Sequence, residues 1–265
     1  MTNRSIVLKI SEIERARGRL EMLKLPSAVR SLLEQPTTGG LLSEEWFLGA
    51  HSHFIPSGGT YRTDQVYLSD PDTGLVHYVP PAPEQIAPLM QELLTWLSRP
   101  ADHPLLFAAT AHFRLVQIHP FLNGNGRVAR HLTTHLLTSA GYPYLHLATL
   151  ADDRPAYYRA LQAVRDQDLD LTPWHHYFLT HLATQLTHLH ARLLITVAPD
   201  LDPRAQQVLG YALCAPQFTL SDLEAEFPTH HRRTWQRALR TLTSRELLKV
   251  SGATNRRTYS LAVCA

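Results

Sequence analysis

Residues 119–130, which read HPFLNGNGRVAR, place a base next to a flexible loop that can hold an anion. The imidazole of His119 ordinarily titrates close to neutral pH, so it can take the proton of a hydroxyl group. Gly124 and Gly126 flank Asn125 and allow left-handed backbone angles, which turn several N–H groups toward one point. The stretch therefore predicts a catalytic loop with an anion-binding backbone.

Two helices are expected to position this loop. Apolar residues recur at helical spacing over 104–116, which predicts a helix with one buried face. Pro120 disfavours the α conformation at His119, so this helix should stop there and present the imidazole at its end. A second apolar pattern over 128–137 predicts that another helix follows the glycines.

Two arginines stand in the first turn of the predicted second helix. Arg127 and Arg130 are three residues apart, so they lie on neighbouring positions of one face. Because the helix dipole disfavours cations at this end, the pair indicates a polyanion held between them. Such an anion would also face the positive end of the helix, and a triphosphate fits this description.

The loop resembles the signature of the Fic family. The positions that match this signature are His119, Phe121, Gly124, Asn125, Gly126, Arg127 and Arg130. The resemblance extends outward and covers most of residues 1–195. It implies a mainly α fold, a Fic-type helical bundle with a β-hairpin flap.

The resemblance also implies an activity. Fic proteins mostly transfer the AMP moiety of ATP to a hydroxyl of a target protein, which implies a protein adenylyltransferase with ATP as its substrate. His119 would be the general base toward a Ser, Thr or Tyr hydroxyl, and Arg127 would support catalysis by neutralising the leaving pyrophosphate.

Nucleotide binding is assigned to the loop and to two tyrosines on a later helix that resemble the family's adenine-side wall. Core packing explains the tyrosines equally well. Phe121 is expected to point into the core as the anchor of the loop. The assigned nucleotide-binding residues are Phe121, Gly124, Asn125, Gly126, Arg127, Arg130, Tyr157 and Tyr158.

One position departs from the family pattern. The family usually has Asp or Glu where this chain has Asn123, and that carboxylate binds the Mg²⁺ that bridges the phosphates. The carbonyl oxygen of Asn can ligate Mg²⁺ or Mn²⁺, but with less charge attraction. Asn123 is thus the expected metal ligand, and the alternative function is a nucleotide-sensing, DNA-binding regulator whose Fic domain is weakly active or inactive.

Two further features of the family have candidates in this chain. Residues 59–80 resemble the flap hairpin, in which Thr60, Tyr61 and Arg62 would dock an extended target segment. Many Fic proteins also carry an inhibitory helix whose glutamate pairs with the second arginine of the motif. Glu34 is the nearest candidate, although its neighbours match that pattern poorly and a solvated glutamate at a helix end is the alternative.

The chain is expected to contain an N-terminal helical region at 1–50, the Fic catalytic domain at 51–198 and a small domain at 199–265. A long amphipathic helix is predicted to end at Val197, because two prolines and two aspartates follow it. Residues 201–265 contain nine Lys and Arg against five Asp and Glu, a net charge of +4, whereas the whole chain carries +2. The basic excess therefore belongs to the small domain.

The small domain is predicted to be a winged helix-turn-helix of the α+β type. Its pattern is a helix at 205–213, a helix at 222–227 capped by Ser221, a helix at 231–247 and a hairpin with strands near 248–250 and 258–261. Such domains bind DNA or, equally often, protein. The candidate DNA-binding residues are Arg232, Arg233, Arg237, Arg256 and Arg257.

Composition sets the remaining expectations. The 265 residues contain no apolar run long enough to span a membrane, so no membrane partner is expected. Two cysteines make no disulfide framework, which favours the reducing cytoplasm. The expected partners are a target protein with a hydroxyl side chain, DNA or protein at the small domain, and a second copy of the chain in a homodimer.

Overall fold

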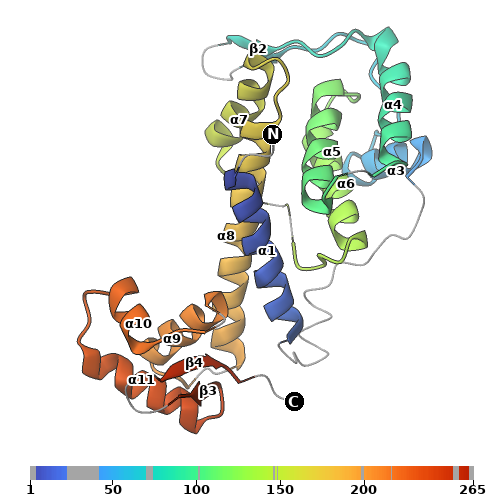
Figure 1. Cartoon of the computed structure of the whole chain (residues 1–265). Coiled ribbons are helices and arrows are strands. Elements are labelled where there is room, and N and C mark those ends of the chain that lie inside the picture. Colours follow the sequence, from blue (N-terminus) through green and yellow to red (C-terminus); the bar gives the residue numbers. More distant parts are fainter. Residues whose placement is uncertain are drawn as a thin grey trace. The chain divides into compact units, whose positions relative to one another are not determined.

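The computed structural model describes residues 4–22, 42–69, 74–100, 102–145, 147, 149–197, 200–215, 217–252 and 257–262. The predicted mainly α class is confirmed, with two short hairpins beside the helices (Figure 1). The chain divides into two compact units, and two of the three divisions fall within helices α1 (Arg4–Met22) and α8 (Thr172–Val197). The first unit comprises Met1–Val7 with Arg30–His181, and the second comprises Leu8–Val29 with Leu182–Ala265.

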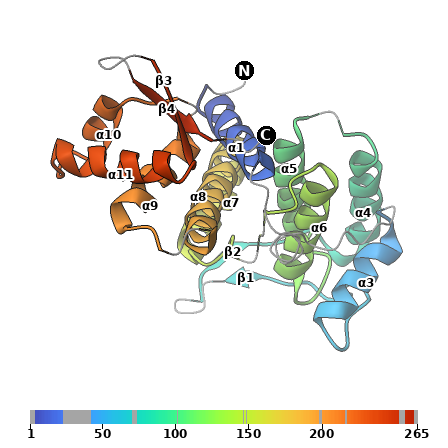
Figure 2. The same cartoon turned by 90° about the horizontal axis from the view of Figure 1, so that it is seen from below.

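The first unit is built around one central helix. Its helices besides the long ones are α3 (Glu44–Phe54), α4 (Pro83–Leu97), α5 (Pro104–Ile118), α6 (Asn125–Ser139) and α7 (Arg154–Asp166). Helix α5 is buried on nearly all sides and packs against α4 and α6; Figure 2 shows the three helices in one group. A helix with apolar residues all round belongs in the middle of a core.

The ends of α5 are set by local chemistry. Pro104 occupies the first turn, where its missing N–H costs nothing, and the His103 ring accepts a hydrogen bond from the Leu105 N–H at 3.3 Å. The helix stops at Ile118, and His119 takes left-handed angles with φ of 51° before Pro120. The predicted helix and its predicted end are therefore confirmed.

A buried polar network ties α5 to α6 and α7. Thr133 donates its hydroxyl hydrogen to the Ala129 carbonyl at 2.6 Å, so it can only accept from Nδ1 of His112, 3.2 Å away. Nε2 of the same ring then accepts from the Tyr157 hydroxyl at 3.0 Å. Burial lowers the pKa of His112 to about 3, so the ring stays neutral and the network is satisfied without a buried charge.

The predicted flap hairpin is present, but its strands are shorter than expected. Strand β1 (Leu68–Ser69) pairs antiparallel with β2 (Val76–Tyr78), with Leu68 opposite Tyr78. The resemblance places the flap at 59–80, but its strand structure is confined to these two short segments. Pro80 and Pro81 have no N–H to extend the ladder, and the Arg62 N–H bonds the Pro120 carbonyl at 2.9 Å instead.

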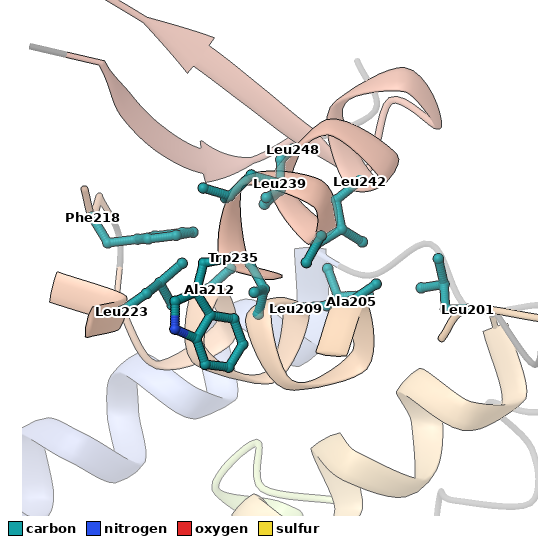
Figure 3. Close-up of a cluster of buried hydrophobic side chains, with 12 residues drawn as sticks. Leu201, Ala205, Leu209, Ala212, Phe218, Leu223, Trp235, Leu239, Leu242 and Leu248 are labelled. Carbon is teal, nitrogen blue, oxygen red and sulfur yellow. The ribbon is translucent and has the colours of Figure 1, made fainter. Parts of the chain in front are cut away.

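The second unit has the predicted order of three helices followed by a hairpin. Its elements after α8 are α9 (Pro203–Cys214), α10 (Leu220–Glu226), α11 (Arg232–Ser244), β3 (Leu248–Ser251) and β4 (Thr258–Leu261). Strands β3 and β4 are antiparallel, and Phe218 adds an isolated bridge to Tyr259 on β4. Figure 3 shows the core, in which Trp235 and Leu239 of α11 face Leu209 of α9.

Two boundaries in this unit differ from the prediction. Helix α10 is capped by Thr219, not by Ser221, because Thr219 and Asp222 form a capping box. The Thr219 hydroxyl accepts from the Asp222 N–H at 3.3 Å, and the Asp222 carboxylate accepts from the Thr219 N–H at 2.7 Å. Helix α11 ends at Ser244 rather than at residue 247, since Glu246 takes a positive φ of 57° and turns the chain toward β3.

Candidate active site

The loop between α5 and α6 is held by the side chain of Asn125, the first residue of α6. The Asn125 amide accepts from the Phe121 N–H at 2.9 Å and donates to the Phe121 carbonyl at 2.7 Å. Asn125 is 3% exposed, and the Phe121 ring is fully buried. The loop is therefore closed on itself at the point where its only aromatic side chain enters the core.

His119 presents one ring nitrogen as a base. Its Nδ1 lies 3.2 Å from the Val116 carbonyl, which can only accept, so Nδ1 carries the hydrogen and Nε2 keeps a free lone pair. Burial lowers the pKa of His119 to about 4, against the Val116 hydrogen bond, with a further lowering by Arg62 and Arg165. The ring is thus neutral at pH 7 and able to accept a proton.

The backbone at the start of α6 is open to an anion. Gly124 is the N-cap of α6 with a positive φ of 74°, which favours glycine. Within the described residues, the amides of Gly124, Asn125 and Gly126 donate no hydrogen bond. These amides and the positive end of a fifteen-residue helix are the groups that we expect to bind an anion, and we call them the nest.

The two arginines of the motif have different surroundings. Arg127 is exposed and donates from Nη1 to the Phe54 carbonyl at 3.0 Å, which bonds it to the end of α3. Arg130 is half-buried and lies over Gly126, where an added Cβ atom would stand 3.3 Å from its Nη1. Arg127 thus lies in the first turn of α6, and Arg130, from the second turn, reaches back over the first with its guanidinium.

Asn123 keeps its side chain exposed at the edge of the nest. Its backbone carbonyl accepts a hydrogen bond from Nε2 of His51 at 3.2 Å, and its side-chain oxygen is a further group that could ligate a metal. In the described part of the chain, no three His, Cys, Asp or Glu side chains come together in a way that could hold a metal ion. A single neutral ligand such as Asn123 fits a divalent cation that is held mainly by nucleotide phosphates and water.

The flap residues do not share one environment, and Arg62, for which a docking role is predicted, is buried. Arg62 is 5% exposed, and its guanidinium donates to the carbonyls of His119, Asp64 and Pro81. It braces the catalytic loop instead of facing a partner. Thr60 is exposed at the base of the flap, whereas Tyr61 is half-buried and its hydroxyl oxygen is buried.

Burial also decides between the readings of the aromatic residues. Tyr157 is 5% exposed and bonds His112 inside the core, which favours the core-packing alternative for its side chain. Tyr158 is 57% exposed and stays available. The buried Phe121 ring is the loop anchor, and only its backbone can lie near a ligand.

Residues of the second unit are placed separately. Arg232 pairs with Glu224 at 2.6 Å, and Arg233, Arg237 and Arg257 are exposed. Two further candidates, Arg256 for DNA binding and Glu34 for inhibition, lie outside the described residues.

Among the described residues, no helix combines the length and the apolar character that crossing a membrane requires.

Two residues near the site were missed in the sequence. Arg165 of α7 lies 3.6 Å over the Tyr78 ring of the flap and donates to the Gln117 side chain of α5 at 3.2 Å. His51 of α3 is 5% exposed and bonds the loop at Asn123. Neither residue stands in a motif, and no local spacing signals a contact between segments this far apart.

Residues 41–137 match the model of the Fic/DOC family. Two curated proteins named "Protein adenylyltransferase Fic", from Drosophila willistoni and Drosophila yakuba, are each 38% identical to this chain over 134 residues. The alignments cover 44% of this chain and 25% and 26% of those proteins. The matched part of the chain thus spans about a quarter of the length of these curated relatives.

The fold is shared with a solved structure along the whole chain. A Fic family protein from Desulfovibrio desulfuricans superposes with a TM-score of 0.58, covering 100% of this chain and 98% of that one at 22% identity. The predicted Fic-type bundle is therefore confirmed as the fold of the first unit.

The surroundings of His119 predict how its ring titrates. At about pH 5 an unperturbed imidazole is mostly protonated, whereas His119 should remain mostly neutral because burial lowers its pKa to about 4. Ring resonances in a nuclear magnetic resonance titration, assigned by their loss in His119→Ala, measure this. A midpoint near the ordinary histidine value would contradict the buried geometry.

Proposed function

We propose, starting from the Fic domain that residues 41–137 of this chain form, that the protein transfers the AMP moiety of ATP to a hydroxyl group of a target protein. One arrangement carries the proposal. A neutral imidazole at the end of α5 adjoins free amides and two arginines at the start of α6. This combination suits nucleophilic attack by a hydroxyl on a phosphate.

The chemistry requires one proton transfer. A Ser, Thr or Tyr oxygen of the target attacks the α-phosphorus of ATP while its proton passes to Nε2 of His119. The bond between the α-phosphate and the β,γ-pyrophosphate breaks, and pyrophosphate leaves. The Gly124, Asn125 and Gly126 amides hold the phosphates, and Arg127 and Arg130 neutralise the charge that grows on the leaving group.

We propose that Mg²⁺ or Mn²⁺ accompanies ATP. Asn123 is exposed, and its side-chain oxygen is the protein ligand that we assign to the cation. A bound cation would supply charge neutralisation for the phosphates. Because a neutral carbonyl attracts a cation less than a carboxylate does, metal affinity should be lower than with Asp at this position.

The target protein is proposed to lie along the flap. Thr60 is exposed at its base, and Tyr67 and Val79 are 62% and 52% exposed beside the strands. An extended segment can pair with such a hairpin and bring its hydroxyl to His119. We place this reaction in the cytoplasm, a proposal supported by the low cysteine content.

A second function, DNA binding by the second unit, is favoured by one observation. Helix α11 buries Trp235 and Leu239 on one face and exposes Arg233, Arg237 and Arg240 on another. These three arginines form no ion pair with any other described residue. An unpaired arginine row on the third helix, followed by a hairpin, resembles the arrangement by which a winged helix meets a duplex.

The first test concerns the base. Transfer of label from ATP marked on its α-phosphate, to the purified protein or to a lysate, should fall at least about a hundredfold in His119→Ala, because no other group takes the proton. His53→Ala removes an exposed histidine of α3 and should transfer like the wild type. Equal labelling by His119→Ala would remove the assigned base.

The second test concerns the metal ligand. Asn123→Asp should strengthen Mg²⁺-dependent ATP binding several-fold, because a carboxylate attracts the cation more strongly. Leu122→Asp places the same charge one residue away, on a side chain that is 63% exposed, and should not strengthen it. Calorimetric titrations with and without Mg²⁺ compare the variants. Identical metal dependence in all three proteins would show that residue 123 binds no cation.

The third test concerns the arginine row. In the full chain, Arg233→Gln with Arg237→Gln should weaken duplex DNA binding and reduce its salt slope by about 2, one for each lost phosphate contact. The matched control changes Arg232 and Arg245, which are already paired with Glu224 and Asp200, and should have less effect. Fluorescence anisotropy at several salt concentrations measures both. Lack of DNA binding by the wild type at low salt would rule out this function.

A further inference from the structure

His51 is not part of the loop 119–130, yet its imidazole lies against it. The residue belongs to α3 and is 5% exposed. Its ring stacks on the Phe121 ring, with centroids 3.9 Å apart and planes at 16°. A histidine from another helix is thus buried directly beneath the anion nest.

The two ring nitrogens of His51 bond two separate segments. The Gly59 N–H lies 2.9 Å from Nδ1 and can only donate, so Nδ1 is an acceptor. Nε2 then carries the hydrogen and donates to the Asn123 carbonyl at 3.2 Å. One tautomer of a neutral ring therefore joins the chain before the flap to the catalytic loop.

Space around the ring is limited on both sides. A Cβ atom at Gly58 would stand 2.9 Å from Nδ1 of His51, and one at Gly124 would stand 3.4 Å from Cδ2 and 3.1 Å from the Ile55 side chain. Real Cβ atoms essentially never approach to 2.9 Å, so glycine at 58 lets the chain reach the ring. The close approach shows that the ring and both segments are packed as one piece.

The bond to Asn123 has a consequence for the next amide. The described residues contain no cis peptide bond, so the carbonyl of Asn123 and the N–H of Gly124 point in opposite directions across one planar peptide. Because the carbonyl points inward to a buried ring, the Gly124 N–H must point outward. Within the described residues, no other hydrogen bond holds this peptide plane.

We propose that His51 is a positioning residue, which aims the Gly124 amide at a nucleotide phosphate by holding the Asn123 carbonyl from behind. The proposal rests on the proposed nucleotide binding by this loop. In this proposal the two Asn125 bonds close the loop at Phe121, and the His51 bond orients the Gly124 amide.

Two substitutions separate this role from plain packing. In His51→Gln the amide nitrogen can reach the place of Nε2 and still donate to the Asn123 carbonyl. In His51→Asn the amide oxygen can reach the place of Nδ1 and accept from the Gly59 N–H, but the donor to Asn123 is lost. Both lose the stacking on Phe121, so their thermal unfolding midpoints should fall by similar amounts.

The measurement is ATP affinity with Mg²⁺, by calorimetry on the full chain. His51→Gln should bind within about threefold of the wild type, and His51→Asn about tenfold more weakly, a difference of about 1.4 kcal/mol. Equal losses in the two variants would reduce His51 to a packing residue and overturn the proposal. Wild-type affinity in both would overturn it as well.

A wild-type measurement keeps the test independent of folding defects. Addition of ATP to ¹⁵N-labelled protein should move the Gly124 amide proton downfield, because it gains a charged acceptor. A Gly126 amide that shifts beside an unchanged Gly124 amide would overturn the role of His51 while leaving nucleotide binding intact. A wild type that binds no ATP would instead overturn the proposed function on which this inference rests.

Discussion

The pair of hydrogen bonds between the Asn125 side chain and the Phe121 backbone is the constraint on which the site depends. At 2.9 and 2.7 Å, with Asn125 and Phe121 buried, these bonds close the turn between α5 and α6. Leaving such buried groups without partners costs about 1–3 kcal/mol each. With the turn closed, the imidazole at the end of one helix must stand next to the free amides that begin the other.

Positive charge around this turn affects both a bound anion and the His119 ring. The arginines and the helix end favour a polyanion, and the guanidinium groups of Arg62 and Arg165 also keep the pKa of His119 low, after burial itself. Arg62 bonds the His119 carbonyl at 2.9 Å, so the same cation also fixes the backbone of the base. An anionic ligand would offset part of this lowering, which links occupancy of the nest to the basicity of the ring.

The second unit has its own core and does not depend on the loop. Trp235, Leu239 and Leu242 of α11 are buried together with residues of α9 and of the hairpin (Figure 3). Since this core uses one face of α11, the opposite face is free to carry arginines at no cost in packing. Helix α11 thus packs into the core with one face and carries the arginines on the other.

Local spacing in the sequence determined the helices of the first unit, the stop at His119, the glycine nest and the order of elements in the second unit. These follow from backbone preferences within a few residues. The tertiary structure alone decided that Arg62 braces the loop, that Tyr157 belongs to the core and that His51 supports Asn123. Their partners are 57, 45 and 72 residues away in the chain. Such contacts depend on how the helices pack, which local spacing in the sequence does not determine. A polar side chain that packing buries must bond a partner inside the protein, and that partner then decides what the side chain does.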